Sequence, residues 1–308
     1  MALLEVDRLS VAFTRYDGAF RQSETAVMHD LHVEADRGEI VAVIGSSGSG
    51  KSLLAHALLG ILPDNAVVRG TIRFDGEALT PRRLEALRGR DIALVPQSVH
   101  YLDPLMRVGA QVRSAVHNGG DPVREQREAF ARLRLPADAE KRYPHQLSGG
   151  MARRVLVSTA TVSGAKLLVA DEPTPGLDPA VVGEALARLR QLADEGAAVL
   201  LISHDIESAL RVADRVAVFY AGTTVELASA ADFAGDGSQL RHPYSRALWR
   251  ALPQNGFVPI AGFQPHPAEL PEGCLFAPRC GMATAECSRE RPAMRELRGG
   301  KARCIHAT

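Results

Sequence analysis

The sequence lacks a charge excess, a long apolar run and a secretory leader. Its 308 residues include 36 Lys and Arg against 36 Asp and Glu, so no strong field of one sign favours nucleic acid or anionic lipid. No stretch reaches the roughly 18 uninterrupted apolar residues of a membrane span. The N-terminal sequence MALLEVDRLS is acidic where a signal peptide needs a basic and then an apolar run. We therefore expect a cytoplasmic protein that takes any membrane part from other chains.

Cysteine is scarce, and it is confined to one end of the chain. The four cysteines all lie within the last 35 residues, at Cys274, Cys280, Cys287 and Cys304. A cytoplasmic chain does not usually form structural disulfides. The confinement therefore indicates a local metal or cluster site.

A glycine-rich loop, GSSGSGKS at residues 45–52, lies between the apolar runs 40–44 and 53–62. It fits the pattern G-x-x-x-x-G-K-[ST], which wraps nucleotide phosphates between a strand and a helix. Its glycines allow backbone N–H groups to converge on phosphate oxygens at the positive end of the helix. The lysine would bring a full charge to the outer phosphates, and the last serine would ligate Mg²⁺. The predicted phosphate-binding residues are Gly45, Ser46, Gly48, Gly50, Lys51 and Ser52.

Strand patterns surround this loop. Residues 3–13 and 31–35 alternate in strand fashion, and 40–44 is short enough to be a strand buried on both faces. We expect the helix after the loop to end at Pro63, and residues 67–74 to form half of a hairpin. A β-rich portion of the chain therefore flanks the loop.

The next part of the chain alternates helices with strands. From about Leu84 to Thr161 the pattern is mostly helical. After it, the sequence predicts strands at 166–170, 198–202 and 215–220, and a helix at about 180–195. Strands that alternate with helices imply right-handed βαβ units and a parallel sheet.

An acidic pair follows the strand predicted at 166–170. In the run LLVADEP, Asp171 can reach the metal shell, and Glu172 can polarise a water against the γ-phosphate. An isolated Asp-Glu after a strand would more often be a solvated turn. A phosphate loop, however, needs such an acidic strand end to hold its Mg²⁺, so the pairing favours a catalytic role.

The sequence LSGGM at 147–151 opens a helical run. Ser148 could cap that helix, and the exposed N–H groups of Gly149 and Gly150 would then form a second anion site. Taken alone, however, the motif favours an ordinary capped helix.

Six motifs occur in the order typical of one protein family. They are GSSGSGKS, Gln97, LSGGM, LLVADEP, Leu177-Asp178 and Ser203-His204-Asp205. Over roughly residues 3–230 the chain resembles the nucleotide-binding subunit of ABC transporters. The resemblance implies an α/β fold, a P-loop NTPase core of the RecA type with an antiparallel β subdomain and an inserted α-helical signature subdomain at about 98–162. It also implies an active ATPase that binds ATP and Mg²⁺.

The resemblance further implies roles for single residues. Glu172 would be the general base, and His204 would hold the γ-phosphate and orient that base. Gln97 would contact Mg²⁺ and the attacking water. Ser52 and Asp171 would complete the protein ligands of the metal ion.

The family also implies a dimer. Two subunits would stack head to tail and sandwich two ATP molecules, each between residues 45–52 of one subunit and residues 148–150 of the other. Asp178 would cross the interface. Because the chain carries one phosphate loop and one LSGG, nucleotide binding should join two chains rather than close one. Phe13 would stack on adenine, with Tyr16 as the alternative.

The C-terminal segment resembles the appended tail of oligopeptide, dipeptide and nickel importer ATPases. The similarity lies in HPYSRAL at 242–248, in ALP at 251–253 and in the region of the four cysteines. Pro, Gly and Cys accumulate beyond about residue 235, which predicts a boundary between a nucleotide-binding domain, 1–235, and a tail, 236–308. We expect the tail to be a small irregular domain with a sensing role, away from the ATP.

The cysteines could be packing thiols, a zinc site or the ligands of an iron–sulfur cluster. Spacings of five, six and sixteen residues lack the close pairs of a zinc knuckle. From the first cysteine to the last, seven Lys and Arg accompany three Glu, an excess that suits four thiolates around a [4Fe–4S] core. Subunits resembling this one carry such clusters, which favours a [4Fe–4S] cluster over zinc. Its ligands would be Cys274, Cys280, Cys287 and Cys304.

The sequence thus predicts the ATPase subunit of an importer for di- and oligopeptides or for nickel and its chelates. It would lie at the cytoplasmic face of the cell membrane. Its partners would be a second ABC ATPase subunit, identical or paralogous, two permease subunits and an extracellular substrate-binding protein, without nucleic acid. The alternative is a soluble ABC ATPase of DNA repair or translation. Such proteins usually have a coiled-coil insertion or two ATPase units in one chain, and neither is visible in the sequence.

Overall fold

The computed structural model describes residues 2–17 and 21–307. The chain forms two compact units that interleave along the sequence. The first consists of Met1–Leu3, Ala35–Ile40 and Leu79–Ser203, and the second of Leu4–Glu34, Val41–Ala78 and His204–Thr308.

Three parallel strands form the sheet of the first unit. β7 (Leu167–Asp171) lies between β6 (Ile92–Val95) and β8 (Ala198–Ile202). Every residue of β7 and β8 is buried, as parallel strands covered on both faces require. These two strands confirm the prediction. The helical pattern predicted for residues 84–161 is wrong at β6, because four apolar residues are too few to distinguish a helical period from a strand.

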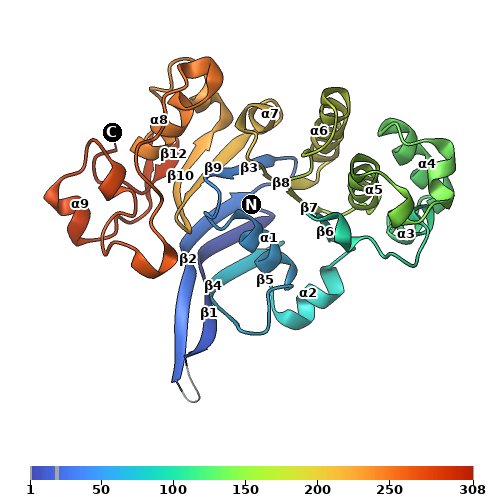
Figure 1. Ribbon diagram of the computed structural model, residues 1–308, viewed down its shortest axis with the longest axis horizontal. Helices are drawn as coiled ribbons and strands as arrows, with labels where there is room; N and C mark the ends of the chain where they lie inside the picture. The colour runs from blue at the N-terminus through green and yellow to red at the C-terminus, as the bar shows by residue number, and fades with distance from the viewer. Residues whose placement is uncertain (1, 18–20, 308) are drawn as a thin grey trace. The chain divides into compact units, whose positions relative to one another are not determined.

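The other regular elements of this unit are helices. They are α2 (Pro81–Leu87), α3 (Val108–Ser114), α4 (Pro122–Arg132), α5 (Gly149–Thr161) and α6 (Pro179–Asp194), with the short 3-10 helices η1 (Val99–Tyr101), η2 (Ala137–Lys141) and η3 (Pro144–Gln146). Helices α3, α4 and α5 pack around a core of their own that includes Val112, Phe130 and Val155 (Figure 1). This separate core explains how a helical insertion stays folded beside a parallel sheet.

The second unit carries five strands in the order β11-β12-β10-β9-β3. β3 (Ile40–Gly45) runs parallel to β9 (Arg215–Tyr220), and β10 (Thr223–Ser229) returns antiparallel to β9. β12 (Gly300–Ala302) and β11 (Arg295–Leu297) then add an antiparallel edge. The tail is therefore less irregular than predicted, because its last strands continue the sheet of the phosphate loop.

A second sheet in this unit is antiparallel, with strand order β2-β1-β4-β5. It consists of β2 (Arg21–Ala35), β1 (Leu4–Asp17), β4 (Ala66–Phe74) and β5 (Glu77–Ala78), drawn in blue and cyan in Figure 1. β4 pairs with β1 and with β5, so the predicted hairpin and the β subdomain are confirmed.

Helix α1 (Lys51–Leu59) follows the phosphate loop but does not reach Pro63. Gly60 ends it in the left-handed conformation with φ of 62°, a common end for a helix because glycine has no Cβ. The remaining helices are α7 (Ile206–Leu210), α8 (Pro243–Arg250) and α9 (Ala285–Arg289), with η4 (Ala230–Phe233), η5 (Pro253–Asn255), η6 (Pro267–Glu269) and η7 (Ala277–Arg279).

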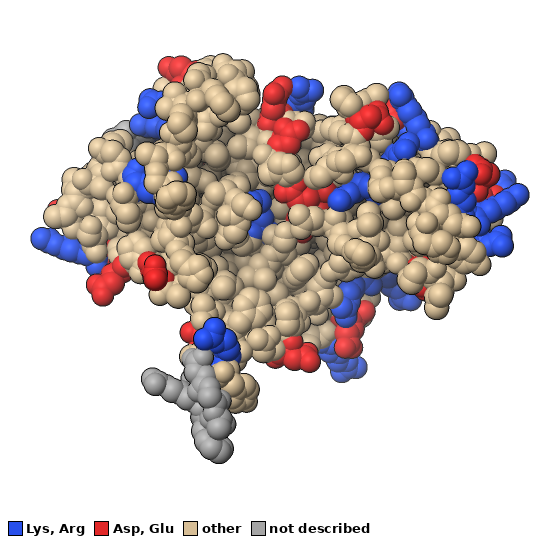
Figure 2. All heavy atoms as spheres, viewed as in Figure 1, with Lys and Arg blue, Asp and Glu red and all other residues tan. Residues whose placement is uncertain are grey.

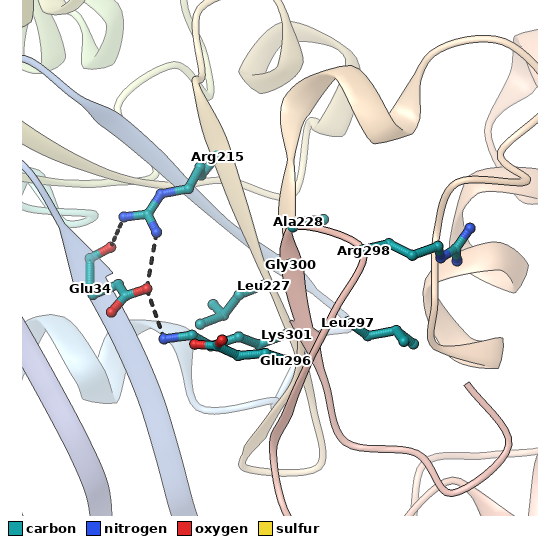
Figure 3. A pocket seen from close by; sticks show the side chains of 10 residues that line it. Glu34, Arg215, Leu227, Ala228, Glu296, Leu297, Arg298, Gly300 and Lys301 are labelled. Atoms are coloured by element: carbon teal, nitrogen blue, oxygen red, sulfur yellow. Dashed lines mark hydrogen bonds and ion pairs between the residues drawn. The ribbon is translucent and has the colours of Figure 1, made fainter. Parts of the chain in front are cut away.

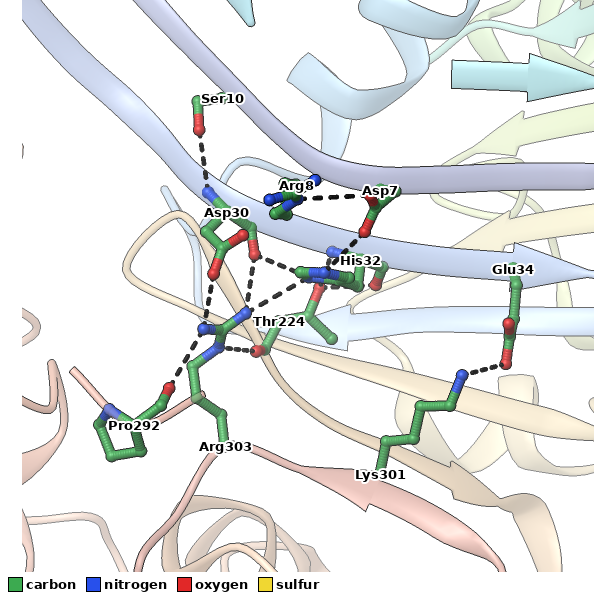
Figure 4. A network of polar contacts seen from close by, with 10 residues as sticks. All are labelled: Asp7, Arg8, Ser10, Asp30, His32, Glu34, Thr224, Pro292, Lys301 and Arg303. Carbon is green, nitrogen blue, oxygen red and sulfur yellow. Dashed lines mark hydrogen bonds and ion pairs between the residues drawn. The ribbon is translucent and has the colours of Figure 1, made fainter. Parts of the chain in front are cut away.

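Arg303 ties the end of the tail to β2 (Figure 4). Its nearly buried guanidinium donates to both the carboxylate and the carbonyl oxygen of Asp30, at 2.7 and 2.9 Å. It also donates to the carbonyl oxygens of Thr224 in β10 and Pro292. Charge-assisted bonds to several strands at once make this arginine a specific anchor.

Glu34 makes a second anchor at the rim of a pocket of about 390 Å³ (Figure 3). Its carboxylate pairs with Arg215 of β9 and Lys301 of β12, both at 3.1 Å. Burial raises the pKa of Glu34, but the hydrogen bonds and charges of Lys301 and Arg215 outweigh burial and leave that pKa below its usual value. The ion pairs therefore stabilise the fold above the ordinary glutamate pKa and lose this contribution as pH falls through the depressed value.

Among residues 2–17 and 21–307, no helix combines the length and apolarity needed to cross a membrane. On the face drawn in Figure 2, basic and acidic side chains are interspersed among the described residues. This mixture agrees with the equal numbers of the two charges in the sequence.

Glu226 on β10 is the most deeply buried charge of the tail's attachment. It is 0% exposed and accepts the backbone N–H groups of Arg241 and His242, each at 2.8 Å. The Arg241 side chain pairs with both Glu226 and Asp232. One buried carboxylate thus fixes the chain at the start of α8.

We predict that Glu226→Leu lowers the free energy of unfolding by about 3 kcal/mol or more, since it leaves the buried guanidinium of Arg241 partly uncompensated. Urea titration followed by circular dichroism measures this loss. The matched control is Glu207→Leu, which breaks an exposed pair with Arg211 and should cost less than about 1 kcal/mol. Equal losses in the two variants would contradict the role given to burial.

Candidate functional site

The phosphate loop occupies the turn from β3 into α1, as the sequence predicts. Gly45 has φ of 149°, and a Cβ there would lie 2.2 Å from the carbonyl oxygen of Phe219. Gly50 precedes the helix in the left-handed conformation, with φ of 95°. At position 45 only glycine fits without moving the neighbouring strand β9. Packing, as well as the predicted binding of phosphate, therefore requires glycine there.

Lys51 lies along the inside of this loop. Its side chain is nearly buried, and its Nζ donates to the carbonyl oxygens of Gly45 and Ser46, both at 3.0 Å. The charge is therefore held at the N-terminal end of α1, where backbone N–H groups also favour an anion. Such an arrangement can bind phosphate.

The acidic strand end is buried in the first unit. Asp171, the last residue of β7, is 2% exposed, and Glu172 is 7% exposed. Glu172 adopts a left-handed backbone with φ of 51°, which is rare for a residue other than glycine. Its N–H donates to the carbonyl of Ile202 at 3.0 Å, and its carbonyl accepts from Arg153 at 2.9 Å. The surroundings thus hold a strained backbone in place at the residue predicted as the base.

Arg153 is a residue that the sequence analysis missed. It lies on α5, the helix that LSGG opens, and burial lowers the pKa of its guanidinium while the charges of Glu172 and Asp171 oppose that shift. The only signal in the sequence is its place three residues after the motif. Its partner is distant in sequence, so no local pattern could have identified the contact.

The residues of the LSGG motif lie at the N-terminal end of α5. Ser148 caps this helix, accepting the N–H of Met151 at 3.3 Å, so the predicted cap is confirmed. Ser148 and Gly149 are exposed, and a Cβ on Gly150 would lie 3.2 Å from the carbonyl oxygen of Gly176. The exposed end of the helix can therefore receive an anion from outside this unit.

Three further predicted residues follow strands or cap helices. Gln97 is exposed two residues after β6, and His204 is exposed two residues after β8. Asp178 caps α6, accepting the N–H of Val181 at 3.2 Å. For adenine stacking, Phe13 is half-buried on β1, whereas Tyr16 on the same strand is 68% exposed.

The predicted site residues fall in both units. The second unit brings together Lys51, Ser52 and the loop glycines, and it also contains Phe13 and His204. The first unit contains Gln97, Ser148, Gly149, Gly150, Asp171, Glu172 and Asp178. Within the first unit, the structure places the signature helix against the acidic strand end through Arg153.

The tail contacts the phosphate loop, so the expectation that it lies away from the ATP is wrong. The N–H of Ser46 donates to the hydroxyl of Tyr244 at 3.1 Å, and the Ser46 hydroxyl donates to the side-chain oxygen of Gln264. Burial lowers the pKa of His242 to about 3, which keeps its ring neutral, so that Nδ1 can accept the N–H of Tyr244. Long-range pairing of this kind has no signature in a local sequence window.

The four cysteines are free thiols. Cys287 and Cys304 are buried, and the N–H of Cys274 donates to the carbonyl of Cys287 at 2.8 Å. Burial raises the pKa of Cys274 and of Cys304, and neighbouring thiols of the set add to both shifts, so the four sulfurs lie in one region. Within residues 2–17 and 21–307, no three His, Cys, Asp or Glu side chains are arranged to hold a single metal ion.

Comparison with known proteins identifies the family. The family model described as ABC transporter matches residues 28–175, and the model described as oligopeptide/dipeptide transporter, C-terminal region, matches residues 225–287. The dipeptide transport ATP-binding protein DppD of Escherichia coli K12 is 35% identical, over 99% of this chain and 97% of its own length. The oligopeptide transport ATP-binding protein OppD of Salmonella typhimurium is 36% identical, over 94% of this chain and 89% of its own.

Solved structures agree on the fold. The ATP-binding cassette MJ0796, in a dimeric post-hydrolysis state with ADP and Pi, superposes with a TM-score of 0.64. It is 23% identical and covers 74% of this chain and 98% of its own, so this likeness shows the P-loop NTPase fold alone. Together with the two curated relatives, these matches show that the chain belongs to the ATP-binding subunits of ABC transporters and is an ATPase.

Proposed function

We propose that the chain is the ATP-hydrolysing subunit of an importer for di- and oligopeptides. The observation that carries this proposal is the union, in one chain, of a formed phosphate loop with a C-terminal region of the oligopeptide/dipeptide type. Relatives that match nearly the whole chain are a dipeptide and an oligopeptide transport protein, which supports peptides over nickel. The same relatives disfavour a soluble ATPase of DNA repair or translation.

The predicted site residues supply a mechanism for ATP hydrolysis. Lys51 would neutralise the outer phosphates, and Glu172 would polarise the attacking water. Ser52, Asp171 and Gln97 would hold Mg²⁺, which neutralises charge that develops on the phosphates. The bonds that pin the Glu172 backbone support this assignment, since a fixed base loses little orientation when the site closes.

Further residues would complete the site. His204 would hold the γ-phosphate and orient the base, and Phe13, half-buried on β1, would stack on adenine in preference to the exposed Tyr16. We infer that a second ATPase chain closes the pocket. The exposed Ser148 and Gly149 at the start of α5 are suited to phosphates held by another copy or a paralogue, with Asp178 crossing the interface.

We further infer that the subunit works at the cytoplasmic face of the cell membrane, as a peripheral protein. Two permease subunits would form the pore, and an extracellular binding protein would deliver the peptide. Nucleic acid has no part in this function. The nucleotide-binding domain would end near residue 235, within the segment 225–287 that matches the C-terminal region of oligopeptide/dipeptide transporters.

We predict that Glu172→Gln lowers kcat for ATP hydrolysis by about a hundredfold or more, while the Kd for ATP changes little, because the amide cannot accept the proton of the water. Steady-state phosphate release and equilibrium binding of ATP measure the two quantities. Glu85→Gln, an exposed change on α2, serves as the control. Unchanged turnover in Glu172→Gln would remove Glu172 from the role of base.

In cells that carry the complete transporter, the same Glu172→Gln substitution should abolish uptake of a radiolabelled dipeptide. The parent chain should support this uptake, and Glu85→Gln should support it equally. Uptake of radioactive nickel is measured in the same cells. If nickel uptake stops and peptide uptake persists, the proposed substrate class is wrong.

For the tail we propose a [4Fe–4S] cluster on Cys274, Cys280, Cys287 and Cys304. Neighbouring thiols of the set raise the pKa of Cys274 and of Cys304, which supports one shared region for the four sulfurs. The bound cluster would add an electron-transfer or redox-sensing centre to the tail.

Protein purified without oxygen should contain about four iron and four sulfide per chain, and Cys304→Ser should lower both contents. Elemental analysis and acid-labile sulfide assays measure them. Ser288→Ala, which changes a neighbouring hydroxyl and no thiol, is the control. One zinc per chain without iron would overturn this assignment in favour of the zinc site.

A further inference from the structure

We propose that Tyr244 and Gln264 are positioning residues for the phosphate loop. They hold Ser46 so that its carbonyl fixes the position of the Lys51 ammonium. This inference rests on the proposed role of the loop in ATP binding and extends it to the tail.

Ser46 is held by the tail through two of its polar groups. Its N–H donates to the Tyr244 hydroxyl at 3.1 Å. Its own hydroxyl donates to the side-chain oxygen of Gln264, which also accepts the N–H of Ala221 at 3.3 Å. The bonds come from two separate segments of the tail, so they restrict both the backbone and the side chain of Ser46.

The third polar group of Ser46 acts on the lysine. The Ser46 carbonyl and the Gly45 carbonyl each accept a bond from the Lys51 Nζ at 3.0 Å. The N–H of Ser46 is bonded to Tyr244 of the tail, and the Ser46 carbonyl is bonded to Lys51. A change in the tail therefore reorients the carbonyl that positions the Lys51 ammonium. The tail therefore acts on phosphate binding through Ser46.

Tyr244 is a rigid support. It is 1% exposed, and the centroid of its ring lies 4.6 Å from that of Tyr220 and 5.3 Å from that of Phe276. It is the second residue of α8, and Glu226 accepts the N–H groups of the two residues that precede this helix. An aromatic side chain held on several sides keeps its hydroxyl in one place, which is what a positioning group requires.

Gln264 is supported by a neighbouring arginine. Arg279 donates to the carbonyl oxygens of Ile260 and Ala261, at 3.0 and 2.7 Å, and to the Tyr220 hydroxyl at 3.2 Å. These bonds fix the chain a few residues before Gln264 to the same aromatic cluster. Both contacts with Ser46 thus depend on one body of packed side chains.

The first test is Tyr244→Phe in the full chain, which removes the hydroxyl and keeps the ring. We expect the Kd for Mg–ATP to rise about three- to tenfold, the effect of losing one hydrogen bond, while kcat at saturating ATP stays within about twofold. Equilibrium binding and steady-state kinetics measure the two. A purely structural role would lower the melting temperature and leave the Kd of the folded protein unchanged.

The matched control is Tyr220→Phe. It removes one hydroxyl from the same aromatic cluster, and that hydroxyl bonds Arg279 and not the loop. Arg279 keeps its two bonds to the carbonyl oxygens of Ile260 and Ala261, so the chain before Gln264 stays fixed in this variant. We expect its Kd for ATP to stay within about twofold of the parent value, less than the loss of a single hydrogen bond to the loop would cause. Equal rises in the two variants would overturn the proposal, because they would show a general loosening of the cluster.

A second test covers the case in which Tyr244→Phe fails to fold. Gln264→Met removes the accepting oxygen at a partly exposed position. It should weaken ATP binding in the parent background. The effect should be smaller when Ser46→Ala has already removed the serine hydroxyl, since both changes delete the same bond between Ser46 and Gln264. Additive effects in this cycle would contradict action through Ser46.

Lys51→Ala separates this inference from the function on which it rests. If Lys51→Ala abolishes ATP binding while Tyr244→Phe and Gln264→Met leave the Kd unchanged, the loop binds ATP but the tail does not position it. If Lys51→Ala leaves ATP binding intact, the proposed phosphate site itself fails, and the positioning role fails with it.

Discussion

The turn from β3 into α1 is the constraint on which the second unit depends. Gly45 passes so close to the carbonyl of Phe219 that no side chain fits, and the chain then turns so that N–H groups and Lys51 gather at the start of a helix. The strand β9 that crowds Gly45 also leads to the tight turn at Ala221 and Gly222. Loop, sheet and helix are therefore specified together, and a change in one would move the phosphate-binding groups.

Charged side chains attach the tail to this same body. Glu226 accepts the N–H groups of the two residues before α8. Arg303, directly after β12, pairs with Asp30, and Lys301 on β12 pairs with Glu34. Removing one partner of the buried pair between Glu226 and Arg241 would leave a buried charge uncompensated, so this contact favours the native attachment of the tail. Phe276, two residues after Cys274, packs against Tyr244, so the cysteine region reaches the phosphate loop through one aromatic contact.

Local patterns predicted the elements whose chemistry is contiguous in sequence. The phosphate loop, the buried strands β7 and β8, the cap at Ser148 and the hairpin at β4 all follow from glycine placement, apolar runs and capping residues. The short strand β6 was missed because four residues carry too little periodicity. The end of α1 was misplaced because Gly60, rather than the later proline, takes the left-handed conformation.

The sequence by itself determined the fold class, the family and the nucleotide chemistry, because each depends on motifs of a few adjacent residues. Only the tertiary structure decided which distant groups meet those motifs. It brought Arg153 to the Glu172 backbone, and it brought Tyr244 and Gln264 to Ser46. The physical reason is that a hydrogen bond between residues nearly two hundred or more positions apart depends on how the intervening strands pack, and no local window records that packing.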